Sequence, residues 1–75
     1  MATTRGTGVV RSWSDDDGWG VVDSEGTPGG CFAHFSHIQM DGYHRLRPGQ
    51  HVAFTAIPMQ IEGCTWQAEW VHPLD

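Results

Sequence analysis

Two short stretches limit most strongly which fold this chain can adopt, because each alternates large and small side chains. Residues 31–36 spell Cys-Phe-Ala-His-Phe-Ser, and residues 18–22 spell Gly-Trp-Gly-Val-Val. Successive side chains of a β-strand point to opposite faces, so Phe32 and His34 should share one face and the small residues beside them the other. Trp19 should lie outward in the same way. The pattern predicts two neighbouring strands that show flat rings to solvent, and unstacked bases pack on such rings.

Turn residues and alternation divide the rest of the chain into further strands. Strands are expected over residues 7–14, 19–23, 31–35, 51–57 and 65–72. The segments between them are expected to be a loose N-terminus at 1–5, turns at 15–18 and 25–30, one helical turn at 36–39, a long loop at 40–50 and an interruption at 58–63. Five short strands with a long crossing after the third predict an all-β protein, a five-stranded antiparallel barrel that closes and so leaves no exposed edge.

The last two strands supply most of the predicted core. Val52 and Phe54 alternate with more polar neighbours and are expected to point inward, and Ala56 continues that face. Trp66 and Trp70 have the same parity as Ala68 in the fifth strand, which predicts that both rings plug the barrel or cover its end.

Length and charge limit the classes of function. A chain of 75 residues suits a single small domain over 1–75 with one thin core, and leaves no room for an enzyme pocket with a lid. Four arginines and no lysine face nine acidic residues, for a net charge of -5. This composition excludes a generally basic coat for nucleic acid, so any anion must bind at a local patch. Residues 15–17, three aspartates in a row, form a negative spot.

Neither a signal peptide nor a membrane-spanning apolar run is present in the sequence, which predicts a cytoplasmic protein with no membrane partner. Two cysteines, Cys31 and Cys64, are therefore expected to stay reduced. The spacing of Cys31, His34 and His37 invites a zinc site, but on a strand the first two point to opposite faces and zinc needs convergent ligands. No metal, cofactor or catalytic constellation is expected, and the chain is not predicted to be an enzyme.

The two ring-bearing stretches, in this order, resemble the bacterial cold-shock protein family. Family members carry a Lys-Gly-Phe-Gly-Phe-Ile-like segment on the second strand and a Val-Phe-Val-His-Phe-Ser-like segment on the third. This chain has Asp-Gly-Trp-Gly-Val-Val at 17–22 and Cys-Phe-Ala-His-Phe-Ser at 31–36, and the likeness continues through 38–39, 41–43, Leu46 and 49–54. It covers roughly residues 6–72. The resemblance implies an OB-fold cold-shock domain that binds single-stranded RNA or DNA with little sequence preference.

The chain also departs from the family pattern. Ser12 and Val21 stand where relatives usually have rings, and Asp17 stands where a lysine is common. The segment 58–66 is longer than usual and lacks a basic residue, whereas Arg45 and its neighbours make the preceding loop more basic. The resemblance therefore implies single-strand binding on a thinned platform, and a diverged barrel that serves as a protein-interaction module stays open as the alternative.

The resemblance and the alternation together predict the binding residues. Rings are expected to stack on bases and arginines to contact phosphates, in a protein that acts as a monomeric nucleic-acid chaperone or regulator of gene expression. The predicted set is Arg11, Trp13, Trp19, Val21, Phe32, His34, Phe35, Tyr43, His44 and Arg45.

Overall fold

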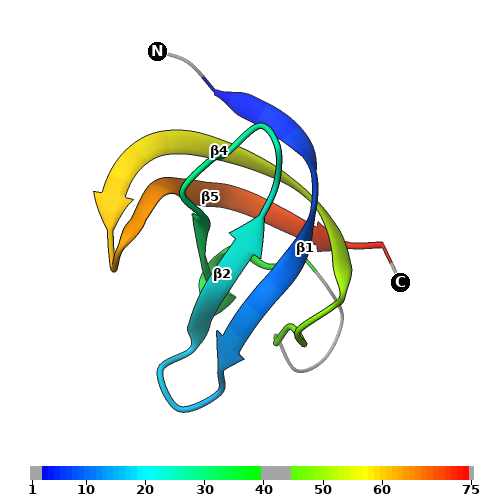
Figure 1. Ribbon diagram of the computed structural model, residues 1–75. Helices are drawn as coiled ribbons and strands as arrows, with labels where there is room; N and C mark the ends of the chain where they lie inside the picture. Colours follow the sequence, from blue (N-terminus) through cyan, green and yellow to red (C-terminus); the bar gives the residue numbers. More distant parts are fainter. Residues whose placement is uncertain (1–2, 40–44, 75) are drawn as a thin grey trace.

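A computed structural model describes residues 3–39 and 45–74 of the chain (Figure 1). In these ranges it contains β1 (Thr4–Ser14), β2 (Trp19–Asp23), β3 (Cys31–His34), the 3-10 turn η1 (Phe35–His37), β4 (His51–Ile61) and β5 (Cys64–Pro73). No helix in the described part of the chain is long and apolar enough to span a membrane.

The strands form a closed barrel in the order β1-β2-β3-β5-β4. Neighbouring strands are antiparallel except for β3 and β5, which run parallel through the pairs Cys31–Trp66 and Phe32–Gln67. The expected five-stranded all-β barrel is confirmed, with this one parallel closure. Figure 1 shows β4 and β5 running side by side to a shared tip at the left of the view.

The core lies inside the barrel and is built mostly from small and branched side chains. Cys31 and Ala33 are fully buried, as are Val52, Phe54 and Ala56, so the predicted inward faces of β3 and β4 are confirmed. Both cysteines of the chain are free thiols. Burial raises the pKa of the Cys31 thiol to about 12, so this side chain packs as a small apolar group.

β1 begins earlier than the sequence indicated. Thr4 pairs with Ala56 and Arg5 with Thr55, so the expected loose N-terminus at 1–5 is wrong for its last two residues; residues 1 and 2 lie outside the described residues. Thr4 and Arg5 are polar, so they give no alternation of apolar residues from which a strand could be predicted. Their place in β1 is fixed by backbone pairing with β4.

β4 continues through Pro58, which was expected to interrupt it. Pro58 pairs with Trp66 on one side. On the other side, within the described residues, the pairing of β4 with β1 ends at Ala56, so the missing N–H of proline breaks none of the described ladder bonds. The strand ends only at the two-residue turn of Glu62 and Gly63, whose φ angles of 51° and 80° are those of a primed hairpin turn.

Trp70 is not in the core, which corrects the prediction made from its parity with Ala68. The register of β5 shifts between the pairs Thr55–Trp70 and Ala56–Ala68. One extra residue in β5 forms a bulge, and a bulge reverses the alternation beyond it. Trp70 is therefore 39% exposed, whereas Trp66, before the bulge, is partly buried against the core.

Candidate nucleic-acid interface

Four rings follow one another across the outer side of β2, β3 and η1, and are called here the ring series: Trp19, Phe32, His34 and Phe35. The centroids of neighbouring rings lie 5.0 Å apart for Trp19 and Phe32, 6.4 Å for Phe32 and His34, and 4.6 Å for His34 and Phe35. Trp19 lies opposite His34 in the β2–β3 ladder, which confirms that the two ring-bearing stretches are neighbouring strands. The arrangement gives a continuous series of ring-to-ring contacts.

The last ring of the series is positioned by the turn between β1 and β2. The backbone N–H of Phe35 donates to the carbonyl of Gly18 at 2.8 Å. Gly18 has a φ of 77°, and a Cβ atom there would come within 2.8 Å of the Phe35 ring. Only glycine fits both the backbone conformation and the close ring, so the Gly18–Trp19 dipeptide sets where Phe35 lies.

His34 is held by its own strand end. Its Nδ1 accepts a hydrogen bond from the backbone N–H of Ser36 at 3.3 Å and lies 2.7 Å from the Ser36 hydroxyl. Because Nδ1 acts as an acceptor, the proton of the neutral ring is on Nε2. The ring can therefore stack on a base and offer one N–H donor at its outer edge.

The ring series is not equally exposed, which corrects the expectation that Phe32 projects into solvent. Phe35 is 46% exposed, but Phe32 is only 6% exposed. Phe32 forms a second cluster with Val21 and Cys64, and Ile61 packs against it. The tip of the β4–β5 hairpin, defined here as Ile61 to Cys64, thus covers the Val21–Phe32 half of the surface.

One hydrogen bond and the close approach of Gly30 to Cys64 and Val21 bring β5 and the hairpin tip close to β3. The Thr65 hydroxyl donates to the carbonyl of Pro28 at 2.7 Å, which joins the start of β5 to the β2–β3 loop. A Cβ atom on Gly30 would lie 3.6 Å from the Cys64 sulfur and 3.1 Å from Val21. This cover was not predicted from the sequence, in which the only signal for it is the apolar pair Ile61 and Cys64 within the segment 58–66.

Arg11, predicted to contact phosphate, is held by a carboxylate. It sits at a β-bulge in β1, and its Nε donates to both oxygens of Asp23 at 2.9 and 3.0 Å, with a further contact from Nη2. These hydrogen bonds lower the pKa of Asp23 and raise the pKa of Arg11. The pair stays ionised until the pH falls through the lowered pKa of Asp23, and its charges largely cancel at the edge of the ring series.

The other predicted residues lie at the acidic turn or outside the described residues. Trp13 is partly buried against the core, and its indole N–H donates to Asp15 at 3.0 Å. Arg45 forms an ion pair with the same carboxylate at 3.4 Å. Asp15 therefore joins the end of β1 to Arg45, the first described residue after 40–44. Tyr43 and His44 lie outside the described residues, and their roles remain predictions.

Cys64, unlike Cys31, lies at the outer cluster. Burial is the main cause that raises the pKa of its thiol, although the nearby Arg11 guanidinium opposes the shift. In residues 3–39 and 45–74, no three metal-ligating side chains come together. Cys31 belongs to the inner core while His34 lies outside, so these two do not converge on one site.

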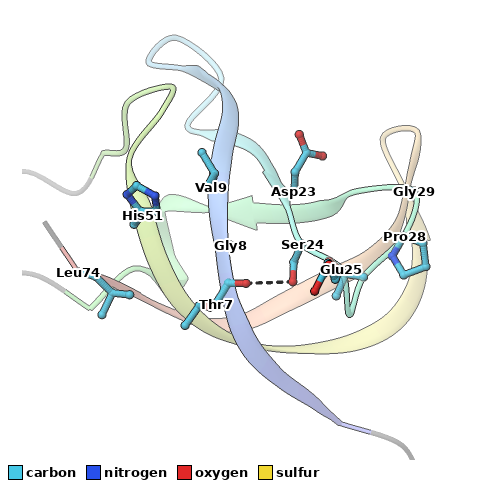
Figure 2. Close-up of a pocket in the computed structure, with 11 residues that line it drawn as sticks. Thr7, Gly8, Val9, Asp23, Ser24, Glu25, Pro28, Gly29, His51 and Leu74 are labelled. Atoms are coloured by element: carbon cyan, nitrogen blue, oxygen red, sulfur yellow. Dashed lines mark hydrogen bonds between the residues drawn. The ribbon is translucent and has the colours of Figure 1, made fainter.

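A hollow lies beside β1, between this strand and the β2–β3 loop (Figure 2). Val9 contributes an apolar wall, and the Ser24 hydroxyl donates to the carbonyl of Thr7 at 3.0 Å. Asp23 and Glu25 also line the hollow. Two carboxylates make it a poor site for a phosphate, so the ring series remains the candidate interface.

The sequence matches the family described as 'Cold-shock' DNA-binding domain over residues 6–71. It is 46% identical over 48 residues to the Cold shock-like protein CspD of Vibrio cholerae, an alignment that covers 64% of this chain and 63% of that relative. This chain therefore spans just under two thirds of the length of that relative. It is also 40% identical over 50 residues to the Cold shock-like protein of Aquifex aeolicus, covering 67% of this chain and 71% of the relative. To the Cold shock protein CapA of Pseudomonas fragi it is 36% identical over 52 residues, covering 69% and 81%.

The cover over Phe32 predicts that two phenylalanines of the ring series differ in their structural role. Phe32→Ala should lower the free energy of unfolding by about 2–4 kcal/mol, because it opens a cavity between β3 and the hairpin tip. Phe35→Ala should change it by about 0.5–1 kcal/mol or less, because the ring is half exposed. Urea unfolding of both variants measures the difference. Equal and small losses would show that the hairpin tip does not pack on Phe32.

Proposed function

The chain belongs to the 'Cold-shock' DNA-binding domain family, and on this premise we propose that it binds single-stranded RNA or DNA by stacking bases on Trp19, His34 and Phe35. The observation that carries the proposal is the ring series, in which flat side chains of two adjacent strands and η1 follow one another at 4.6–6.4 Å. Every base has a π-face, so such a surface binds with little sequence preference.

Stacking supplies most of the affinity in this proposal. Each base stacked on an exposed ring contributes about 1–3 kcal/mol by the measure of alanine substitution. Phe32 lies between Trp19 and His34 but is covered by the hairpin tip. Its ring therefore supports its neighbours from beneath and contacts a base only when the hairpin tip moves away. The accessible surface is divided between Trp19 on β2, which is partly buried against the Phe32 cluster, and the His34–Phe35 pair at the end of β3.

The electrostatic contribution is small in the same proposal. Arg11 is paired with Asp23, Arg45 is paired with Asp15, and the chain has a net charge of -5. A strand that approaches the ring series thus meets few uncompensated cations. Because counterion release scales with the number of phosphates neutralised, the affinity should fall only weakly as salt rises.

The proposal extends to the role of the protein in the cell. A surface that holds bases unpaired melts weak secondary structure, which suits a nucleic-acid chaperone or a regulator of gene expression in the cytoplasm. Stacking needs neither a cofactor nor a catalytic group, so we infer that the protein acts as a binding protein without enzymatic activity. One ring series on one barrel is sufficient for the proposed binding, which is consistent with action as a monomer.

Single-strand preference tests this function. A duplex hides the faces of its bases, so an oligo-dT or oligo-U of about eight nucleotides should bind more tightly than the matching duplex. Fluorescence titration of the tryptophans measures both affinities. His34→Ala and Phe35→Ala should each weaken single-strand binding by about fivefold or more while duplex binding stays unchanged.

Equal affinity for the single strand and the duplex would contradict stacking. Unchanged single-strand binding in both alanine variants, with the fold intact, would favour the alternative that this barrel is a protein-interaction module.

The ion pair beside the ring series gives a separate electrostatic prediction. Asp23→Asn removes the carboxylate that holds Arg11, so single-strand binding should tighten by about twofold to fivefold at low salt and its salt dependence should steepen. Glu25→Gln is the matched control, since it removes one negative charge from the exposed β2–β3 turn. Titrations at two salt concentrations measure both variants. The same gain in both would mean that only net charge matters and that Arg11 does not reach the strand.

A further inference from the structure

A second group of rings lies on the outer face of β1, β4 and β5, away from the ring series on β2 and β3. Thr55 of β4 pairs with Arg5 of β1 on one side and with Trp70 of β5 on the other. In the next outward row, Ala53 is likewise flanked by Thr7 and His72. The ladder therefore places an arginine and two rings on one sheet surface, with small side chains between them.

The two rings are arranged as a flat surface. The planes of Trp70 and His72 differ by only 9°, and their centroids lie 5.7 Å apart. Trp70 is 39% exposed, and His72 is also exposed. The bulge in β5 turns Trp70 outward, which places both rings on the same face of the strand. Two adjacent exposed rings with nearly parallel planes form a contiguous flat surface, the kind of exposed patch that can mark an interaction site.

A hollow separates this flat surface from the arginine. Arg5 and Trp70 line its opposite sides, and Ala53 and Thr55 line it between them. Partly buried small residues on the strand between leave room above the sheet for a flat group. A planar ring in this hollow would meet the Trp70 indole and the guanidinium of Arg5, a group that also stacks on flat rings and pairs with phosphates.

Charge favours a nucleic acid over an acidic or apolar partner here. The chain carries nine acidic residues, but Glu69 is the only one in the segments 4–7, 53–55 and 68–72 that build this face. Arg5 provides a positive charge, and His72 adds a ring that can donate a hydrogen bond. Rings beside a cation, with small residues between, are the combination that single strands bind.

We propose that Arg5, Trp70 and His72 form a second stacking surface for single-stranded nucleic acid, which takes one or two bases and a phosphate. This surface lies on different strands from the ring series, so one molecule holds two strands, or two segments of one strand, at the same time. Its affinity is lower than that of the ring series, because it has fewer rings. This second site rests on the proposed function, single-strand binding, and shares no residue with the first site.

The experiment counts bound oligonucleotides by isothermal titration calorimetry with an oligo-dT of about four nucleotides, the lower end of the site size of one OB fold. The wild type should bind two per chain, one tightly and one weakly. Trp70→Thr should remove the weak site and leave the tight one unchanged, whereas Trp70→Phe should keep both. His34→Ala combined with Phe35→Ala should weaken only the tight site.

Arg5→Gln tests the charge, with Arg47→Gln as its matched control because both arginines are exposed. Arg5→Gln should weaken the second site by about fivefold, and Arg47→Gln should not. Thermal unfolding of every variant confirms that the fold is retained.

The proposal of a second surface is overturned if calorimetry finds one oligonucleotide per wild-type chain and Trp70→Thr has no effect on binding. A change in self-association on sedimentation without a change in oligonucleotide binding would also overturn it, and would assign the face to a contact between copies of the chain. The proposed first site fails by a different result, namely a tight site that survives loss of His34 and Phe35.

Discussion

The closure of the barrel between β3 and β5 is the interaction on which the rest of the structure depends. It consists of two parallel pairs, Cys31–Trp66 and Phe32–Gln67, and is reinforced by the hydrogen bond from Thr65 to Pro28 and by the packing of Cys64. These contacts remove the open edge that β3 would otherwise present. They also bring the hairpin tip over Phe32, so the contacts that complete the fold cover part of the aromatic surface used for the proposed binding.

Because barrel closure covers Phe32, the remaining aromatic surface is small and lies among paired charges. Backbone contacts of Gly18 and Ser36 position the rings of Phe35 and His34, and Trp19 packs partly buried against the Phe32 cluster. The nearby cations are already paired with carboxylates. The proposed binding therefore relies more on rings than on charge. A weaker second surface of the same chemistry, at Arg5 and Trp70, would compensate for the shortened first one by allowing two contacts with a long strand.

The sequence predicted much of this because alternation and turn residues are local signals. The β2–β3 ladder, the inward faces of β3 and β4 and the closed barrel could all be inferred from them. The wrong predictions concern residues whose orientation depends on neighbouring strands and not on the alternation within their own strand. A bulge turned Trp70 outward, β4 continued through Pro58 beyond its described pairing with β1, and the hairpin tip buried Phe32. Each depends on which strands lie side by side, information that no single stretch contains. The roles of Tyr43 and His44 remain predictions from the resemblance alone.

The four tryptophans allow the central claim, that bases stack on the open part of the ring series, to be tested in one spectrum. Each indole N–H gives its own signal in a proton–nitrogen NMR titration with a short oligo-dT. At one equivalent, the account predicts a large shift of the Trp19 signal and little change for Trp66, which is packed against the core, with Trp70 shifting only at higher ratios. A Trp19 signal that stays in place while the oligonucleotide binds would contradict it.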